Sequence, residues 1–357
     1  MRIQAQAVPG RTRLACVLVA IVAVATICGP TAATAAPKTD VVVLRNGDRI
    51  TGEIKSLDYN LLKVSTDTMG TIYVEWDKIE RIQSDQYLLL ERADGTRAYG
   101  QLVAEGSDAR LLVRSDPAGP PVPVPMVEVV RARPIDGGDF IDRLDGYVSA
   151  GLDLSQSGDN TSLDFAGGLS SRTQVREWSV DGNANITDDT ATRTERYSIA
   201  GLARRLLQDN YYYQGQASLL RNTELELNVR SLVGGGLGRY FVRSNRAEWA
   251  AGVGLGYNHE NYSGVDPVDS LELLLGTELS IFRYDFPETD IGGAIYVLPS
   301  LTKSGRVRSE VDLHANYEFV DDLYFELRMY GSYDSEPPSA SAPSSDYGFV
   351  TSLGYKF

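Results

Sequence analysis

Two histidines are the residues of this chain best suited to acid–base chemistry, and His259 is the first of them. It directly precedes Glu260 and Asn261, so a carboxylate or an amide could orient its ring. A zinc site needs three or four protein ligands, and one imidazole with one carboxylate falls short of that. We therefore expect no metal site and no cofactor here.

The second histidine, His314, lies between Asp312 and Asn316. A hydrolase needs a histidine with an orienting partner and a serine or water for it to activate. Neither histidine lies in a recognisable motif of that kind, and an inward-facing histidine with acidic neighbours more often belongs to a hydrogen-bonded plug. We therefore predict that the protein is not an enzyme.

The N-terminal residues predict the compartment in which the protein folds. Positively charged residues precede an apolar run over 14–27, and small residues follow up to Ala35. This is the pattern of a secretory signal peptide, and the run is shorter than the roughly 20 residues of a membrane-spanning helix. We expect a signal peptide over 1–35. It removes both cysteines, Cys16 and Cys28, so the mature chain has no disulfide and no thiolate metal site.

The charge balance of the mature chain is strongly acidic. The whole chain has 34 Lys and Arg against 48 Asp and Glu, and the leader holds three of the basic residues and no acidic one, which leaves 31 minus 48, or −17. Such a chain is an improbable nucleic-acid partner, so we expect no nucleic-acid binding. No later stretch has the length of an apolar helix, so any membrane crossing must use strands.

The first mature part, residues 36–140, contains an internal repeat. VVVLRNGDRITGEI (41–54) resembles LLLERADGTRAYGQL (88–102), and each copy predicts strands around a tight Asn-Gly or Asp-Gly turn. The pattern resembles two tandem SH3-like or Sm-like small barrels. Without a basic patch or an aromatic platform, we favour structure or protein docking in the periplasm over RNA binding. At an offset of 48 the matched residues are Asn46-Gly47 with Asp94-Gly95, Gly52 with Gly100, Ile54 with Leu102, and Ile79-Glu80 with Val127-Glu128.

The second part, residues 141–357, alternates apolar and polar residues with the period of a strand. One face of a strand carries Trp249, Val253 and Tyr257, while the intervening residues of other strands are charged. Long and short connections also alternate, and aromatic residues gather on the short-turn side. We therefore predict an all-β transmembrane antiparallel barrel with lipid outside and charges inside. Its twelve predicted strands are 146–155, 161–172, 176–187, 194–207, 211–222, 228–241, 247–258, 270–284, 290–301, 306–319, 323–334 and 347–357.

The last strand predicts how such a barrel closes and assembles. YGFVTSLGYKF places aromatic and apolar residues on alternate positions and ends on an aromatic residue. We expect this strand to pair with the first strand of the barrel, because edges left open in lipid are costly. Leu353, Tyr355 and Phe357 are the predicted C-terminal assembly signal, with outer-membrane lipid and the barrel-assembly machinery as partners.

These features together resemble a known family. A signal peptide, an LRNGDRITGEI module, a barrel that opens with GYVSAGLDLSQSGDNTS and an LGYKF ending are similar to the salt-induced outer membrane protein family, YdiY-like (domain of unknown function 481). Asp159 is an insertion relative to the turn expected there. The resemblance implies residence in the outer membrane of a Gram-negative bacterium and a loose link to salt or osmotic conditions, but it implies no activity.

The inward charges suggest two functions that the sequence leaves open. A surplus of carboxylates in the lumen predicts a narrow cation-preferring pore or an envelope component, unless the charges are paired in an occluded lumen. Alternatively, the barrel anchors a docking protein, and the periplasmic N-terminal domain binds a protein partner or the cell wall. The predicted lumen-facing charges are Asp153, Asp164, Asp181, Glu248, Glu272, Glu278, Glu310, Asp312, Glu326, Arg204, Arg308 and Arg328.

Overall fold

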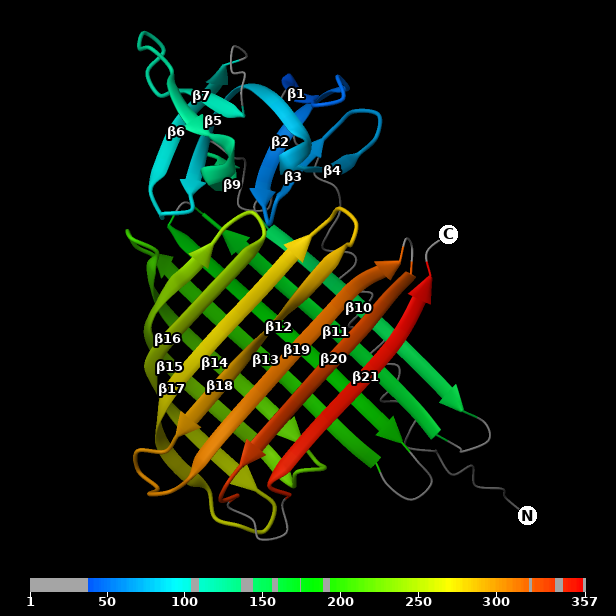
Figure 1. Cartoon of the computed structure of the whole chain (residues 1–357). Coiled ribbons are helices and arrows are strands. Elements are labelled where there is room, and N and C mark those ends of the chain that lie inside the picture. Colours follow the sequence, from blue (N-terminus) through cyan, green and yellow to red (C-terminus); the bar gives the residue numbers. More distant parts are fainter. Residues whose placement is uncertain are drawn as a thin grey trace, which may run out of the picture. The chain divides into compact units, whose positions relative to one another are not determined.

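The computed structural model describes residues 38–103, 109–135, 144–155, 160–173, 175–188, 193–320, 323–337 and 343–355 (Figure 1). The predicted signal peptide and Phe357 lie outside these residues, as do the side chains of residues 153–160. In the described part, no helix combines the length and the hydrophobicity that a bilayer crossing requires.

The first sheet repeats one order of elements twice. Each copy has four strands, a short 3-10 helix and a closing strand, and the long strand β5 both closes the first copy and opens the second. The elements are β1 (Asp40–Leu44), β2 (Arg49–Asp58), β3 (Leu61–Ser65), β4 (Thr71–Glu75), η1 (Trp76–Lys78), β5 (Ile79–Arg92), β6 (Arg97–Val103), β7 (Arg110–Arg114), β8 (Val122–Pro125), η2 (Met126–Glu128) and β9 (Val129–Pro134).

The backbone hydrogen bonds of the two copies correspond, but the spacing between copies changes along the chain. Gly47 and Gly95 both have positive φ in the first tight turn, as the Asn-Gly and Asp-Gly pairs predict. The helices η1 and η2 begin at Trp76 and Met126, which are 50 residues apart. The predicted match of Ile79-Glu80 with Val127-Glu128 is therefore wrong by two residues, because the later connections of the second copy are longer.

The two copies share one hydrophobic core. Buried residues of both copies, from Val42 and Ile54 to Leu102 and Val129, form a single cluster. The Trp76 indole Nε1–H donates to the Met126 carbonyl oxygen at 2.8 Å, so the two short helices contact each other. The copies thus form one folded unit, and their assignment to the SH3-like or Sm-like class stays a prediction.

The second sheet has twelve antiparallel strands in sequence order, which confirms the predicted strands and their number. Most bounds lie within two residues of the prediction, and β16 extends four residues further. The strands are β10 (Leu144–Ser155), β11 (Asn160–Arg172), β12 (Arg176–Asp188), β13 (Arg193–Leu206), β14 (Tyr211–Asn222), β15 (Leu227–Arg243), β16 (Ala247–Tyr262), β17 (Val268–Arg283), β18 (Thr289–Pro299), β19 (Val307–Val320), β20 (Leu323–Asp334) and β21 (Ser345–Tyr355).

The faces of this sheet are inverted relative to those of a water-soluble barrel. Large apolar side chains on one face, such as Val253, Leu255 and Leu275, are exposed. The opposite face buries charged residues such as Glu272 and Arg308. Apolar outside and charged inside is the arrangement of a transmembrane barrel.

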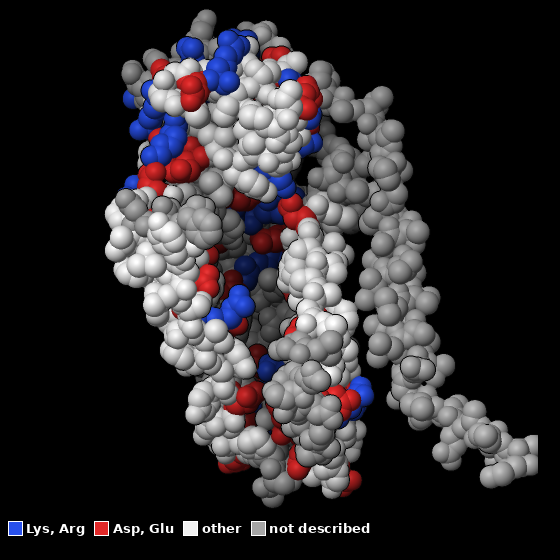
Figure 2. All heavy atoms as spheres, turned by 90° about the vertical axis from the view of Figure 1, so that its right-hand side faces the viewer, with Lys and Arg blue, Asp and Glu red and all other residues white. Residues whose placement is uncertain are grey.

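The sheet curls around its charged face, but its two edge strands stay apart. No ladder joins β10 to β21 in the described residues, so the predicted pairing of the last strand with the first is wrong in this structure. Both edges lie on the same side of the molecule (Figure 1), and the perpendicular view shows a long slot there with charged side chains inside (Figure 2). We call the opening between β10 and β21 the lateral slot.

Glycines let the curled sheet bend sharply at β15 and β16. A Cβ atom on Gly236 would lie 2.3 Å from the Val253 carbonyl oxygen, and one on Gly254 would lie 2.4 Å from the Gly235 oxygen. Such distances are shorter than any real contact, so only glycine permits this approach of the two backbones. The bend brings β13 and β17, four strands apart, to opposite sides of one narrow lumen.

Candidate functional site

The lumen is crossed by an ion pair between strands that do not neighbour each other. Arg204 on β13 donates from Nη2 to both carboxylate oxygens of Glu278 on β17, at 2.7 and 2.8 Å. The Gln214 Oε1 accepts from Arg204, and the Tyr296 hydroxyl donates to Glu278 at 2.8 Å. Because one Arg204 nitrogen contacts both oxygens of Glu278 and a neutral side chain holds each partner, the pair forms a fixed brace across the lumen.

A second network closes one side of the lumen at the end where the long loops lie. Glu260 on β16 accepts from Arg230 on β15 at 2.7 Å, and its other oxygen lies 2.7 Å from the Nη2 of Arg306. Arg306 also binds Asp334 on β20. These contacts tie β15 to β20, and Glu260 and Arg306 are fully buried. The network therefore holds no free charge for a passing ion.

The Glu272–Arg308 pair belongs to the same buried region. Arg308 donates from Nε and Nη2 to the two carboxylate oxygens at 3.0 and 2.7 Å, and both side chains are almost fully buried. Asn258 and Ser270 donate further hydrogen bonds to Glu272. Buried pairs of this geometry satisfy each other.

The other predicted carboxylates form a separate set on the strands that flank the lateral slot. They are exposed, and none has an arginine within hydrogen-bonding distance in the described structure. Asp164 accepts from Asn185 at 2.5 Å, Glu326 from Ser352 at 2.7 Å, and Glu310 lies 3.8 Å from Arg308. We call this set the slot carboxylates: Asp164 on β11, Asp181 on β12, Glu310 and Asp312 on β19, and Glu326 on β20.

Besides the paired Arg308, cationic side chains lie on and beside the strands of these carboxylates. Arg328 is exposed on β20. Arg196 on β13 reaches Asp346 at the start of β21 at 3.6 Å, so one end of the lumen is bridged behind the slot. Asp153 is paired in register with Ser162, and its side chain is outside the described part. The described slot region thus has more negative than positive charge.

A cavity connects the two sets of charges. Its volume is about 320 Å³, and Asp181, Glu310, Glu278 and Gln216 contribute to its lining. The lining thus includes two of the slot carboxylates, Asp181 and Glu310, together with Glu278 of the brace. The cavity can hold hydrated cations beside carboxylates, but the brace limits its width.

The repeat module closes the mouth at the short-turn end with buried charges. Glu91 on β5 accepts from Arg243 on β15 at 2.9 Å and from Arg172 on β11 at 3.4 Å. Asn210, in the turn after β13, donates to the Ala93 carbonyl oxygen at 2.9 Å. Burial alone would raise the pKa of Glu91, but the charges of Arg243 and Arg172 lower it by more than burial raises it. The pKa of Glu91 therefore lies below its ordinary value. Glu91 is therefore ionised and fixed between two barrel strands.

Arg131 on β9 adds the reciprocal contact from the same module. Its guanidinium lies 3.0 Å from the Glu248 carboxylate of β16 and 3.3 Å from Asp58. It also stacks over the Tyr59 ring, which meets Phe282 of β17 edge to face at 5.2 Å between ring centroids. Glu248, predicted to face the lumen, thus binds the module.

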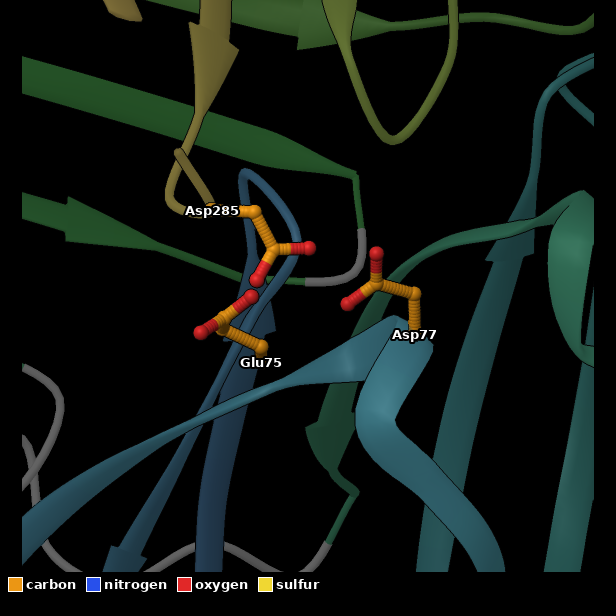
Figure 3. Close-up of side chains that lie close together, drawn as sticks. All are labelled: Glu75, Asp77 and Asp285. Atoms are coloured by element: carbon orange, nitrogen blue, oxygen red, sulfur yellow. The ribbon is translucent and has the colours of Figure 1, made fainter. Parts of the chain in front are cut away.

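Three carboxylates gather at the edge of this contact (Figure 3). Glu75, Asp77 and Asp285 each place an oxygen within 4.8 Å of the others, and oxygen ligands suit a divalent cation. The Lys78 ammonium lies 2.7 Å from Asp285 and already compensates part of this charge. Partial burial and then the Asp285 charge raise the pKa of Glu75.

The two histidines lie apart from the lumen cavity. His259 Nδ1 lies 2.7 Å from Asp269, which also accepts from the Tyr257 hydroxyl at 2.7 Å. His314 Nε2 lies 3.5 Å from Asp290. Each histidine thus has a carboxylate partner. Ser231 of β15 is paired with His259 in register, but no hydrogen bond joins a serine or threonine hydroxyl to either ring among the described contacts.

Sequence reasoning missed the residues that join the module to the barrel. Glu91 is 81 residues from Arg172 and 152 residues from Arg243 along the chain, so no local pattern pairs them. A weak signal was available at the equivalent position of the first copy, where the repeat has Val43 in place of a charge. A buried charge in only one copy of a repeat is a sign of an additional contact.

Comparison with known proteins gives one family and one curated relative. The family model described as "Protein of unknown function, DUF481" matches residues 148–357. The uncharacterised protein YdiY of Escherichia coli strain K12 is 27% identical over 218 residues, which are 59% of this chain and 82% of the relative. Among solved structures, the alignment with a "Bacterial polysaccharide outer membrane secretin" covers 76% of this chain and 96% of the secretin chain, with 10% identity. The TM-score of 0.31 is too low to establish a shared fold.

Proposed function

Since the family model covers more than half of its residues, the chain belongs to the DUF481 family, and from that premise we propose that it is a narrow, cation-preferring pore of the Gram-negative outer membrane. In this proposal the repeat module lies in the periplasm and covers one mouth of the barrel. The single observation that carries the proposal is the set of exposed slot carboxylates, of which only Glu310 forms an ion pair with an arginine in the described residues, at 3.8 Å from Arg308.

The inverted faces support the membrane location. The chain is an outer-membrane β-barrel-like protein, with twelve antiparallel strands and exposed apolar residues on its outer face. Its connections at the module end, such as 207–210 and 244–246, have two to five residues, whereas those at the other end have four to ten, the longest being 335–344. Short turns face the periplasm in barrels of this class, so the module belongs on that side.

The distribution of charge supports cation preference. The buried glutamates Glu260 and Glu272 are neutralised by arginines, and they therefore contribute little field to the lumen. The slot carboxylates are exposed, and all but Glu310 lack an ion pair with arginine in the described residues. Rings or rows of such groups attract cations and repel anions. The brace between Arg204 and Glu278 keeps the path narrow. Selectivity therefore comes from the slot side alone.

Conductance measurements test this proposal. Purified full-length protein in planar bilayers should give small cation-selective steps, and the double variant Asp181→Asn/Asp312→Asn should reduce the preference for K⁺ over Cl⁻ several-fold. The control Asp266→Asn, in the exposed connection between β16 and β17, should leave selectivity unchanged. Absence of steps, in the wild type and in a variant with a loosened module, would exclude a pore, and anion preference would contradict the charge argument.

The second candidate function is a membrane-anchored docking protein. The observation that favours it is the exposure of aromatic side chains on the module, 61% for Tyr73 and 59% for Tyr99. Exposed aromatic residues are common anchors for protein partners. Crosslinking in intact cells, with Tyr73→Ser/Tyr99→Ser as the comparison, should capture a periplasmic partner or the cell wall only with the wild-type module.

We also propose that neither histidine is catalytic. His259→Ala and His314→Ala should leave unchanged any hydrolase activity measured with the purified protein. Loss of a reproducible activity in either variant would contradict this.

A further inference from the structure

The lateral slot exposes backbone groups that a membrane cannot satisfy. The outer edges of β10 and β21 have no ladder partner in the described residues. Unpaired N–H and C=O groups are costly in hydrocarbon, so the slot must contain water, a second chain or the polar part of a ligand. The slot carboxylates line its inner walls, which makes a positively charged group the best complement.

An apolar trough begins at the same edge, on the outer face of the sheet. One row of paired residues runs across five strands: Val148 on β10, Gly167 on β11, Gly182 on β12, Ile199 on β13 and Leu219 on β14. The two glycines form the floor between larger neighbours such as Phe165 and Tyr197. The trough has a volume of about 520 Å³ and a lining that is almost entirely apolar.

The trough has the dimensions of an alkyl chain. Four strand spacings of about 4.8 Å give it a length of roughly 19 Å, comparable to an extended dodecyl chain. It starts at Val148, which is 85% exposed on the edge strand, so a chain that leaves the slot around β10 enters it directly. Most outer-face positions of the sheet carry large side chains, whereas the central positions of this row are glycines.

The polar and apolar parts lie at the same level of the sheet. Asp181 and Gly182 are consecutive on β12, so their side-chain positions point to opposite faces. Asp164 lies three residues from Gly167 on β11, about 10 Å along the strand. A molecule that wraps the β10 edge could therefore place a charged head near Asp164 and its chain over Gly167 and Gly182.

We propose that the lateral slot and the trough together bind a single-chain alkylammonium amphiphile taken from the lipid phase. The ammonium lies against the slot carboxylates, and its three N–H donors also satisfy carbonyl groups of the open edges. The alkyl chain lies in the trough. This binding depends on the membrane location and on the slot carboxylates but not on ion conduction, so it stands or falls separately from the pore.

Charge and shape exclude the nearest alternatives. An anionic lipid headgroup would place phosphate beside Asp164, Asp181, Glu310, Asp312 and Glu326, and like charges at such distances repel. A strand from a second copy would satisfy the open edge but would leave the trough, which lies on the outer face, without an occupant.

Photolabelling of the full-length protein in phosphatidylcholine nanodiscs tests the proposal. The probe is dodecylammonium with a diazirine at the end of its chain, and mass spectrometry locates the label. The label should lie on strands β10–β14 and should be displaced by unlabelled dodecylammonium but not by dodecyl sulfate. Asp164→Asn/Asp181→Asn should reduce labelling about tenfold, whereas Asp266→Asn should not change it.

A trough variant and an amide measurement complete the test. Gly182→Leu should fill the trough and remove the label from it without a change in charge. The backbone should tolerate this substitution because a Cβ at Gly182 meets only the Ser198 carbonyl oxygen, at 3.6 Å. The variant's heat-modifiable gel mobility verifies its folding. Edge amides of β10 and β21 should exchange hydrogen rapidly in the free protein and more slowly with dodecylammonium.

Three results would overturn the proposal. The first is equal labelling by a neutral dodecanol probe or unchanged labelling of the Asp164→Asn/Asp181→Asn variant. The second is a stable dimer with protected edge amides, which would assign the edges to a second copy. The third is protection of these amides in a monomer, which would mean that β10 and β21 pair with each other. Labelling without conductance would refute only the pore, and conductance without labelling only the amphiphile site.

Discussion

The contact between the module and the barrel predicts the effect of one isosteric substitution, Glu91→Gln. The Glu91 side chain is 7% exposed, and its partners Arg243 and Arg172 are 3% and 9% exposed. The substitution keeps the shape but leaves two buried guanidinium groups with less negative charge. Removal of one partner of a buried ion pair costs about 3–5 kcal/mol.

The remaining partners of the two arginines set where in that range the effect falls. Arg172 keeps Glu177 at 2.7 Å, and Arg243 keeps Glu248 at 3.7 Å. We therefore expect the lower end, about 3 kcal/mol, which is about a hundredfold change in the docking equilibrium at roughly 1.4 kcal/mol per factor of ten. The module should open from the barrel far more often without unfolding either sheet.

Hydrogen exchange measures this opening directly. Amides that only the docked module shields from water should exchange about a hundredfold faster in Glu91→Gln. The matched control is Glu128→Gln, in the same module, because the Glu128–Arg92 pair is solvent-accessible. Equal exchange in Glu91→Gln and the wild type would refute the idea that this ion pair holds the module.

The same pair predicts how docking depends on pH. The pKa of Glu91 is lower in the folded protein than its ordinary value, because the two arginines outweigh the effect of burial. A group with a lowered folded pKa contributes its stability above the unfolded pKa of about 4.3 and loses it as the pH falls through the folded pKa. The protection factor of amides at the contact, which corrects exchange for the intrinsic effect of pH, should thus be constant from neutral pH to about 5 and fall in stronger acid. Glu91→Gln should lack this acid step.

Two further predictions concern the barrel. Arg308→Met leaves Glu272 buried without its bidentate partner and should destabilise the barrel by about 3–5 kcal/mol, whereas Arg308→Met/Glu272→Met should recover most of that loss. The urea concentration at which half of the folded gel band is lost measures both effects, and equal midpoints for the single and double variants would contradict the pairing. Gly236→Ala should prevent folding because its Cβ would lie 2.3 Å from the Val253 carbonyl oxygen, while Gly215→Ala should fold normally because no atom lies within 4 Å of its Cβ. Heat-modifiable gel mobility distinguishes the two variants, and a folded Gly236→Ala variant would refute the close approach.

The strands could be predicted from the sequence because their signal is local. Alternation over ten or more residues, as from Trp249 to Tyr257, needs no knowledge of partners, and the alternating connections add the order of the strands. The edges could not be predicted in the same way. The YGFVTSLGYKF strand looks equally suited to pairing on one edge or two, because its side-chain pattern does not depend on which edges are bonded.

The lumen shows the same limit for charges. Sign and face could be predicted for Glu278 and Asp312 alike, since both occupy inward positions of alternating strands. Only the curl of the sheet decides that Glu278 meets Arg204, 74 residues earlier, while Asp312 meets no arginine. A count of inward charges therefore overstates the negative potential in the lumen. Only the carboxylates that remain after the arginine-paired glutamates are subtracted bear on ion preference.

The open edge and the unpaired carboxylates follow from one electrostatic cause. Away from the slot, the opposite charges of Arg204 on β13 and Glu278 on β17 face each other and draw these strands together across the lumen. On the slot side, Asp164 and Asp181 of β11 and β12 face Glu310, Asp312 and Glu326 of β19 and β20, so closure would bring like charges toward each other at reduced hydration. Positive charge between the walls would remove that repulsion, whether it comes from a metal cation on its way through or from an ammonium head held at the edge. We therefore propose that the slot carboxylates oppose pairing of β10 with β21 and at the same time select the cations that occupy the space between them.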